Sequence, residues 1–192
     1  MIISHRYKLI FIHIHRTGGS SISNLLRDQI GKNMEEIDQH SNVCDLGIDY
    51  FKRLSGYYVF GFARNPWDRL LSWYILLHQN DPLSLSKERL RFEKFIEKDM
   101  VLKDLTNYFH YNALDYFSSQ DGENVPFHIF KYEDIESSIK EVFDKFNLEI
   151  EEIPRLNTTT ERDKKLYYTT KSRQLIAQKC KKDIDYFGYT YD

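Results

Sequence analysis

The chain has little of what marks disulfide-rich, zinc-binding or membrane proteins. Its 192 residues include only two cysteines, Cys44 and Cys180, which lie far apart and in no CxxC or Cys/His spacing. This excludes a disulfide framework and gives no sign of a zinc site, while two free thiols suit a reducing cytoplasm. The opening "MIISHRYKLIFIHIH" holds only a short apolar run interrupted by His. We therefore expect a cytoplasmic protein without a signal peptide or an integral membrane segment.

The chain also lacks an excess of charge of one sign. Lysine and arginine number 27 against 29 aspartate and glutamate residues, which gives a formal net charge of −2. A general basic field for nucleic acid is therefore absent, and any anion site must be local. With 41% hydrophobic residues and no Pro/Gly/Ser-rich linker, the chain is long enough for one core, so we expect a single domain over residues 1–192. The sequence leaves the oligomeric state open.

Alternating apolar segments predict strands that lead into helices. The segment from Lys8 to His15 is typical of a strand buried on both faces. After it, apolar residues at helical spacing predict a helix capped by Ser20 or Ser21. Those apolar residues are Ile22, Leu25, Leu26 and Ile30. The order is thus strand, glycine turn and helix.

The same order recurs twice more along the chain. An apolar run from Tyr57 to Ala63 meets Asn65, a predicted N-cap, and Pro66 at the first helical position. The segment "PFHIFKYEDI" precedes a third helix, and one further helix is predicted from Thr169 or Thr170. Strands that alternate with helices favour an α/β fold with a central, mainly parallel sheet flanked by helices. Residues 79–124 are interpreted as a helical insertion.

The stretch "FIHIHRTGGSSISNLL" predicts an anion site at the first strand-to-helix corner. Gly18 and Gly19 allow positive φ and let backbone N–H groups converge on an oxyanion at the positive end of the helix. Arg16 adds a full charge. Hydroxyl donors come from Thr17, Ser20 and Ser21. The mononucleotide-kinase pattern GxxxxGK[ST] is not present, so the corner does not indicate a magnesium triphosphate site.

Two motifs in order resemble those of sulfotransferases that use 3′-phosphoadenosine 5′-phosphosulfate (PAPS), above all the carbohydrate-type and bacterial branch. "FIHIHRTGGSS" is similar to the phosphosulfate loop, close to FIHIPKTGGTS, and "GFARNPWDRLLSWY" is similar to the 3′-phosphate motif, close to VRNPYDRLVSWY. Softer similarities follow the family's order at "HSNVCDL", "FKYEDI", "RLNTT" and "DIDYFGYTYD". The family's Pro-Lys is His15-Arg16 here, which replaces a point charge by a planar fork of donors.

The resemblance implies roles for residues that match the family's positions. It implies a P-loop-like domain in which the glycine corner holds the phosphosulfate, while Arg64 and Ser72 hold the 3′-phosphate. His40 is implied as the catalytic base and Arg16 as the group at the leaving oxygen. A basic loop after the third helix is implied to close over the cofactor, with Arg162 as the predicted contact.

Several residues remain as alternatives or as expected parts of the surroundings. His15, Glu93 and Glu97 are the alternative bases. Asp68 and Arg69 are interpreted as a capping and ion-pair device. The insertion 79–124 is expected on the acceptor side, where four residues could line a groove or pack in the core: Tyr108, His110, Tyr111 and Asn112.

The expected function is transfer of a sulfuryl group from PAPS to an acceptor hydroxyl on a carbohydrate or glycolipid, with 3′-phosphoadenosine 5′-phosphate (PAP) as product. We expect no metal, because the sulfuryl group carries less charge than a terminal phosphoryl group. The alternatives are a P-loop kinase-like phosphotransferase and a non-catalytic PAP-binding module. The sequence does not identify the acceptor.

Overall fold

Five strands form one sheet in the computed structural model, which describes residues 1–31, 33–97, 103–104, 107–149 and 163–191. The strand order is β3-β1-β2-β4-β7. β2 is parallel to β4, β4 is parallel to β7, and β1 runs antiparallel to its neighbours β2 and β3. Four of the five strands therefore point the same way, and the predicted mainly parallel α/β architecture is confirmed. The strands are β1 (Ile2–Ser4), β2 (Leu9–Phe11), β3 (Glu35–Glu36), β4 (Tyr58–Ala63) and β7 (His128–Lys131).

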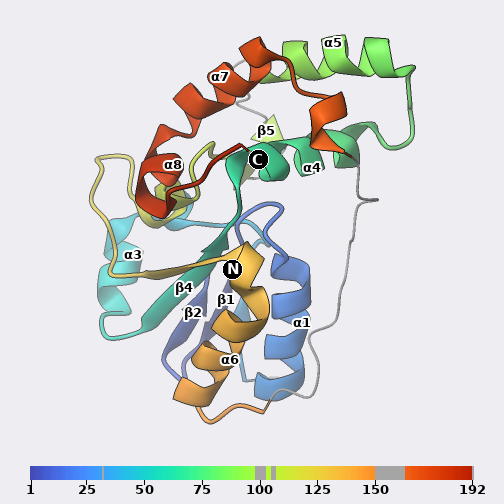
Figure 1. The fold of residues 1–192 in the computed structure, drawn as a ribbon. Helices are drawn as coiled ribbons and strands as arrows, with labels where there is room; N and C mark the ends of the chain where they lie inside the picture. Colours follow the sequence, from blue (N-terminus) through green and yellow to red (C-terminus); the bar gives the residue numbers. More distant parts are fainter. Residues whose placement is uncertain (32, 98–102, 105–106, 150–162, 192) are drawn as a thin grey trace.

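Helices cover both faces of this sheet (Figure 1). Leu9 and Phe11 of β2 pack with α1 (Gly19–Ile30) and α6 (Ile135–Lys145) on one face. Ile10, Ile12 and Ile14 pack on the other face, against α2 (Val43–Leu46), α3 (Ile48–Arg53) and η1 (Ala113–Phe117). The alternation read from the first apolar segment thus divides its side chains between two cores, as expected for a buried strand.

A second group of helices packs above the sheet in Figure 1. It comprises α4 (Pro66–His78), α5 (Leu85–Glu97), α7 (Thr170–Lys179) and α8 (Lys181–Phe187), whose aromatic residues share one core. The smaller elements are β5 (Lys103–Asp104), β6 (Asn107–Tyr108), η2 (Tyr132–Asp134) and η3 (Lys164–Leu166). Among the described residues, no helix has the length and apolar character needed to cross a membrane.

Helix boundaries agree with the sequence at α4 and differ at the C-terminus. Asn65 caps α4 by accepting a hydrogen bond from the Trp67 N–H, and Pro66 is its first residue. The prediction of one continuous C-terminal helix is wrong, because the chain leaves helical geometry at Cys180, between α7 and α8. This break places the buried Asp183 against residues 113 and 114, where it accepts two backbone hydrogen bonds.

Candidate functional site

The glycine loop, residues 15–19, connects β2 to α1 in a tightly constrained path. Arg16 adopts a left-handed backbone at φ 63° and Gly18 does so at φ 75°. A Cβ at Gly18 would lie 2.7 Å from the Tyr132 ring, so this position requires glycine for space as well as for φ. The buried Thr17 hydroxyl donates to the Ile14 carbonyl at 2.9 Å. Its proton therefore closes the loop and is not offered to a ligand.

The start of α1 offers backbone N–H groups to an anion. Gly18 is the N-cap in a left-handed conformation without a side-chain cap bond, so the prediction that Ser20 or Ser21 caps the helix is wrong. The first backbone hydrogen bonds at this end are donated by Ser21 and Ile22 to the Gly18 carbonyl. Helix geometry leaves the N–H groups before Ser21 without intrahelical partners, and the helix dipole adds positive potential.

Arg16, Arg64 and Ser72 lie together at the carboxyl ends of adjacent parallel strands. Ser72 Oγ accepts hydrogen bonds from Arg16 Nε at 2.9 Å and from Arg16 Nη2 at 2.7 Å. Arg64 Nη1 lies 3.5 Å from the Arg16 carbonyl oxygen. Arg16 follows β2, Arg64 follows β4 and Ser72 lies on α4, so the strand order explains why residues 56 positions apart meet. Ligands of open α/β sheets bind at this edge.

This cluster is locally positive although the chain as a whole is slightly acidic. Burial lowers the pKa of Arg16, and the nearby Arg64 guanidinium lowers it further, while Tyr132 acts in the opposite direction. Arg64 Cζ stands 4.8 Å from the centroid of the Tyr132 ring. Within the described part of the chain, no carboxylate forms an ion pair with either guanidinium. Two close, unneutralised guanidiniums favour a bound anion.

Three histidine rings lie next to the glycine loop. The His40 ring stacks on His15 with centroids 3.5 Å apart, and its centroid lies 4.6 Å from that of His13. His40 Nδ1 is 2.9 Å from the His13 carbonyl oxygen. Because a carbonyl only accepts, Nδ1 carries the proton, and Nε2 is the unprotonated nitrogen of the neutral ring. The sequence-predicted base therefore lies beside the loop in a defined tautomer.

His13 and His15 are more deeply buried than His40. Burial is the main cause that lowers the pKa of both rings, and the neighbouring His40 lowers each further. His15 Nδ1 lies 2.7 Å from the Tyr116 hydroxyl. A Cβ at Gly19 would fall 2.0 Å from the His13 ring, so that ring packs directly on the start of α1. Both histidines are neutral at pH 7 and support the loop.

Arg69 is buried and does not form the ion-pair device expected from the sequence. Its guanidinium donates to the carbonyls of His15 at 3.0 Å, Tyr111 at 3.0 Å and His110 at 2.9 Å. Only 1% of the residue is exposed. The side chain therefore ties the glycine loop to the segment that precedes η1. The Asp68 carboxylate instead pairs with Lys164 at 3.4 Å.

Asp183 binds the same segment a few residues further along the chain. Its carboxylate accepts from the N–H groups of Ala113 at 2.6 Å and Leu114 at 3.2 Å. Burial raises the pKa of Asp183, while the nearby Arg69 charge lowers it. The buried Arg69 guanidinium thus binds the carbonyls of residues 110 and 111, and the buried Asp183 carboxylate binds the N–H groups of residues 113 and 114. Arg69 shares a helical face with Trp73. A charged residue on an apolar helical face is the sequence signal that could have revealed the buried role of Arg69.

The alternative carboxylate bases lie between α5 and α7. Glu93 accepts from the Thr169 hydroxyl at 2.8 Å and pairs with Lys171 at 3.2 Å, and Glu97 pairs with the same lysine. These contacts belong to the upper helical group of Figure 1 and do not bring either carboxylate to the glycine loop. Arg162 lies outside the described residues.

Comparison with known proteins identifies the family. The sequence model of the sulfotransferase family matches residues 1–190, nearly the whole chain. The chain belongs to the sulfotransferase family. Searches of curated proteins and of solved structures gave no significant match. Family membership makes this chain a transferase of sulfuryl groups. The positively charged cluster of Arg16, Arg64 and Ser72 suits the anionic substrates of such an enzyme.

Proposed function

We propose that this sulfotransferase-family member transfers the sulfuryl group of PAPS to a hydroxyl of a carbohydrate or glycolipid acceptor. The observation that carries the proposal is the convergence of Arg16, Arg64 and Ser72 beside the glycine loop. PAPS is distinguished from ordinary adenine nucleotides by its 3′-phosphate and its sulfate. A site for PAPS therefore needs two anion-binding subsites, and both are supported by residues in this region.

The 3′-phosphate is assigned to Arg64 and Ser72. A guanidinium fork and a hydroxyl suit a phosphate dianion, and the lack of a carboxylate partner for Arg64 among the described residues leaves its charge for the ligand. The phosphosulfate is assigned to the N–H groups of Gly18, Gly19 and the residues that follow, with Ser20 and Ser21 as nearby hydroxyls. Thr17 contributes through the shape of the loop. The contact of Arg162 with the cofactor remains a prediction.

Transfer proceeds by attack of the acceptor oxygen on sulfur as the bond from sulfur to the bridging phosphate oxygen breaks. The electron pair of that bond leaves with PAP, so negative charge develops on the bridging oxygen. The Arg16 guanidinium and the positive end of α1 stabilise this charge. The acceptor proton passes to His40 Nε2, since Nδ1 is held as a donor by the His13 carbonyl. The products are PAP, the sulfated acceptor and a protonated imidazole.

The test is transfer of labelled sulfate from PAPS to a panel of carbohydrate and glycolipid acceptors, with and without a chelator of divalent ions. We expect transfer that survives chelation, because arginine and backbone dipoles are sufficient for the smaller charge of a sulfuryl group. An absolute magnesium requirement together with phosphoryl transfer from a nucleoside triphosphate would instead support the kinase-like alternative.

A further inference from the structure

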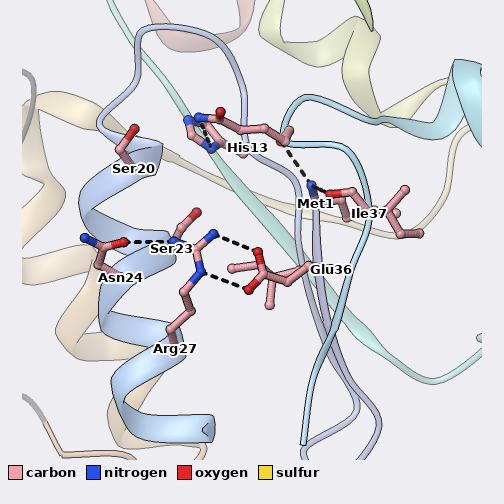
Figure 2. A pocket seen from close by; sticks show the side chains of 10 residues that line it. Met1, His13, Ser20, Ser23, Asn24, Arg27, Glu36 and Ile37 are labelled. Carbon is pink, nitrogen blue, oxygen red and sulfur yellow. Dashed lines mark hydrogen bonds and ion pairs between the residues drawn. The ribbon is translucent and has the colours of Figure 1, made fainter. Parts of the chain in front are cut away.

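A cavity of about 300 Å³ lies between α1 and the β1/β3 edge of the sheet. Figure 2 shows Ser20 and Asn24 of α1 on one side of the cavity, Met1 and Ile37 on the other side, and His13 at one end. β1 and β4 flank β2 on opposite sides. The cavity and Arg64 therefore lie on opposite sides of the glycine loop. A ligand here would approach the loop from the side away from the proposed 3′-phosphate site.

The α1 wall of the cavity is polar and is not saturated by hydrogen bonds within the chain. Ser20, Ser23, Asn24 and Arg27 follow one helical face and all line the cavity. Among the described residues, the hydroxyls of Ser20 and Ser23 form no hydrogen bond, and Asn24 uses only its carbonyl oxygen, which accepts from Arg27 at 2.8 Å. These polar atoms are open to the cavity, so this wall can donate hydrogen bonds to a ligand and accept them from it.

The facing wall is mixed. It includes the buried Ile2 of β1 and the half-buried Ile37, which follows β3, together with Met1, Glu36 and Gln39. A ligand that combines several hydroxyls with carbon-bound hydrogens would match both walls, and a sugar ring has this character. The cavity is at the small end of the range for small-molecule sites, which suits a single ring.

The ionisable groups that line the cavity give it little net charge at pH 7. Burial lowers the pKa of the Met1 amino group to about 6, and this group donates to the carbonyls of residues 37, 38 and 39. Arg27 and Glu36 form a two-pronged pair, with Nε to Oε1 at 2.9 Å and Nη2 to Oε2 at 2.7 Å, drawn as two dashed lines in Figure 2. The hydrogen bond to Glu36 raises the pKa of Arg27, so the pair is fully ionised at pH 7. His13 is neutral at this pH because its pKa is lowered by burial. An anionic ligand would have to compete with Glu36 for Arg27, whereas an uncharged one would leave the pair intact.

We propose that this cavity is an acceptor subsite for an uncharged, hydroxyl-rich ring, that is, a neutral sugar as opposed to a uronic acid. This inference rests on the proposed function and deepens it by naming the class of acceptor. The cavity ends at His13, whose ring centroid is 4.6 Å from that of His40. A sugar held against Ser23 and Asn24 would place a neighbouring hydroxyl at the His13 end of the cavity, the end closest to the proposed base.

The first test measures binding without nucleotide. The ¹⁵N-labelled full chain is titrated with methyl β-galactoside, methyl N-acetyl-β-glucosaminide and methyl β-glucuronide while the side-chain amide of Asn24 is followed by NMR. We expect at least one neutral glycoside to shift this signal, and the glucuronide to bind at least about tenfold more weakly. Asn24→Leu and, as a second variant, Ser23→Ala should each weaken binding of the neutral glycoside by about three- to tenfold.

Gln29→Leu is the matched control, because Gln29 is an exposed amide on the same helix outside the cavity. It should leave glycoside binding unchanged. In the PAPS assay, Asn24→Leu should raise the KM for the neutral glycoside with no change in PAP affinity. Equal or tighter binding of the glucuronide, or unaltered glycoside affinity in folded Asn24→Leu and Ser23→Ala, would overturn the subsite. If PAP fails to bind the wild type, the proposed donor is wrong, and the nucleotide-free titration still decides the cavity.

Discussion

Ser72 Oγ accepts two hydrogen bonds from the Arg16 guanidinium, from Nε at 2.9 Å and from Nη2 at 2.7 Å. This contact joins the glycine loop to α4, and it places the charge of Arg16 beside the residue proposed to bind the 3′-phosphate. Arg16 therefore lies where it can stabilise the bound nucleotide as well as the leaving oxygen. Its effect on binding and its effect on rate should be separable by substitution.

Arg16→Ala should weaken PAP binding by about ten- to a hundredfold, because a charge-assisted contact is lost, and should lower turnover further still. Arg16→Lys keeps the charge but not the two-pronged donor, so its PAP affinity and its turnover should lie between those of Arg16→Ala and the wild type. Calorimetry with PAP and turnover with saturating PAPS measure the two effects. Arg6→Ala, at an exposed position, is the control. Unchanged PAP affinity in Arg16→Ala would contradict this assignment.

His40→Ala should reduce turnover by about 10²- to 10⁴-fold, the usual contribution of a general base, and should leave PAP affinity nearly unchanged. His128→Ala is a suitable control, since His128 is an exposed residue at the start of β7, away from the carboxyl ends of the strands. A turnover within a few-fold of wild type in His40→Ala would exclude His40 as the base.

Because His13 and His15 are buried, we expect the free energy of unfolding to fall at mildly acidic pH. Burial lowers the pKa of His13 and His15 in the folded chain, while an unfolded histidine titrates near 6.5. Above pH 6.5 neither state takes up a proton and the two rings have no effect. Below it, only the unfolded chain is protonated, so the free energy of unfolding should drop by about 1 kcal/mol per histidine for each pH unit.

Urea unfolding at pH 7.5, 6.5 and 5.5 measures this dependence. His15→Phe removes one titrating ring among the aromatic neighbours Trp73 and Phe109, so its stability should depend less steeply on pH between 6.5 and 5.5. The comparison uses the slope of the free energy of unfolding against pH, because loss of the hydrogen bond to Tyr116 also changes the free energy of unfolding at every pH. Identical slopes for the variant and the wild type would show that His15 is protonated equally in both states.

Arg69→Met should destabilise the fold by about 3–5 kcal/mol. The substitution leaves three backbone carbonyls without their donor and removes the cation near the buried Asp183. Urea unfolding at pH 7.5 measures the change, and Arg6→Met is the matched exposed control, expected within about 0.5 kcal/mol of wild type. A loss below about 1 kcal/mol in Arg69→Met would mean that water or the relaxed chain satisfies these carbonyls.

The sheet and the glycine turn between β2 and α1 could be predicted because local patterns specify them. Ile10, Ile12 and Ile14 alternate with Phe11 in the sequence and pack in different cores in the structure. Asn65 precedes Pro66, and this pair begins α4 as predicted. The short antiparallel β1 and β3 were not predicted, because strands of three and two residues carry too little periodicity to be recognised.

The remaining differences arise from tertiary contacts that no local pattern contains. Ser20 or Ser21 was expected to cap α1, yet Gly18 is the N-cap, in a left-handed conformation and in tight contact with Tyr132. Arg69 was interpreted, with Asp68, as part of a capping and ion-pair device, but its partners are carbonyls at positions 15, 110 and 111, which only the folded chain brings together. The cavity beside α1 likewise depends on the pairing of β1 with β3.

The most direct test of the proposed function is calorimetric comparison of PAP and AMP, which differ by the 3′-phosphate. If Arg64 and Ser72 bind that phosphate, the wild type should bind PAP at least about tenfold more tightly than AMP, and Arg64→Ala should remove most of this preference. Equal affinity of the wild type for PAP and AMP would contradict the assignment of the site and, with it, the proposed donor.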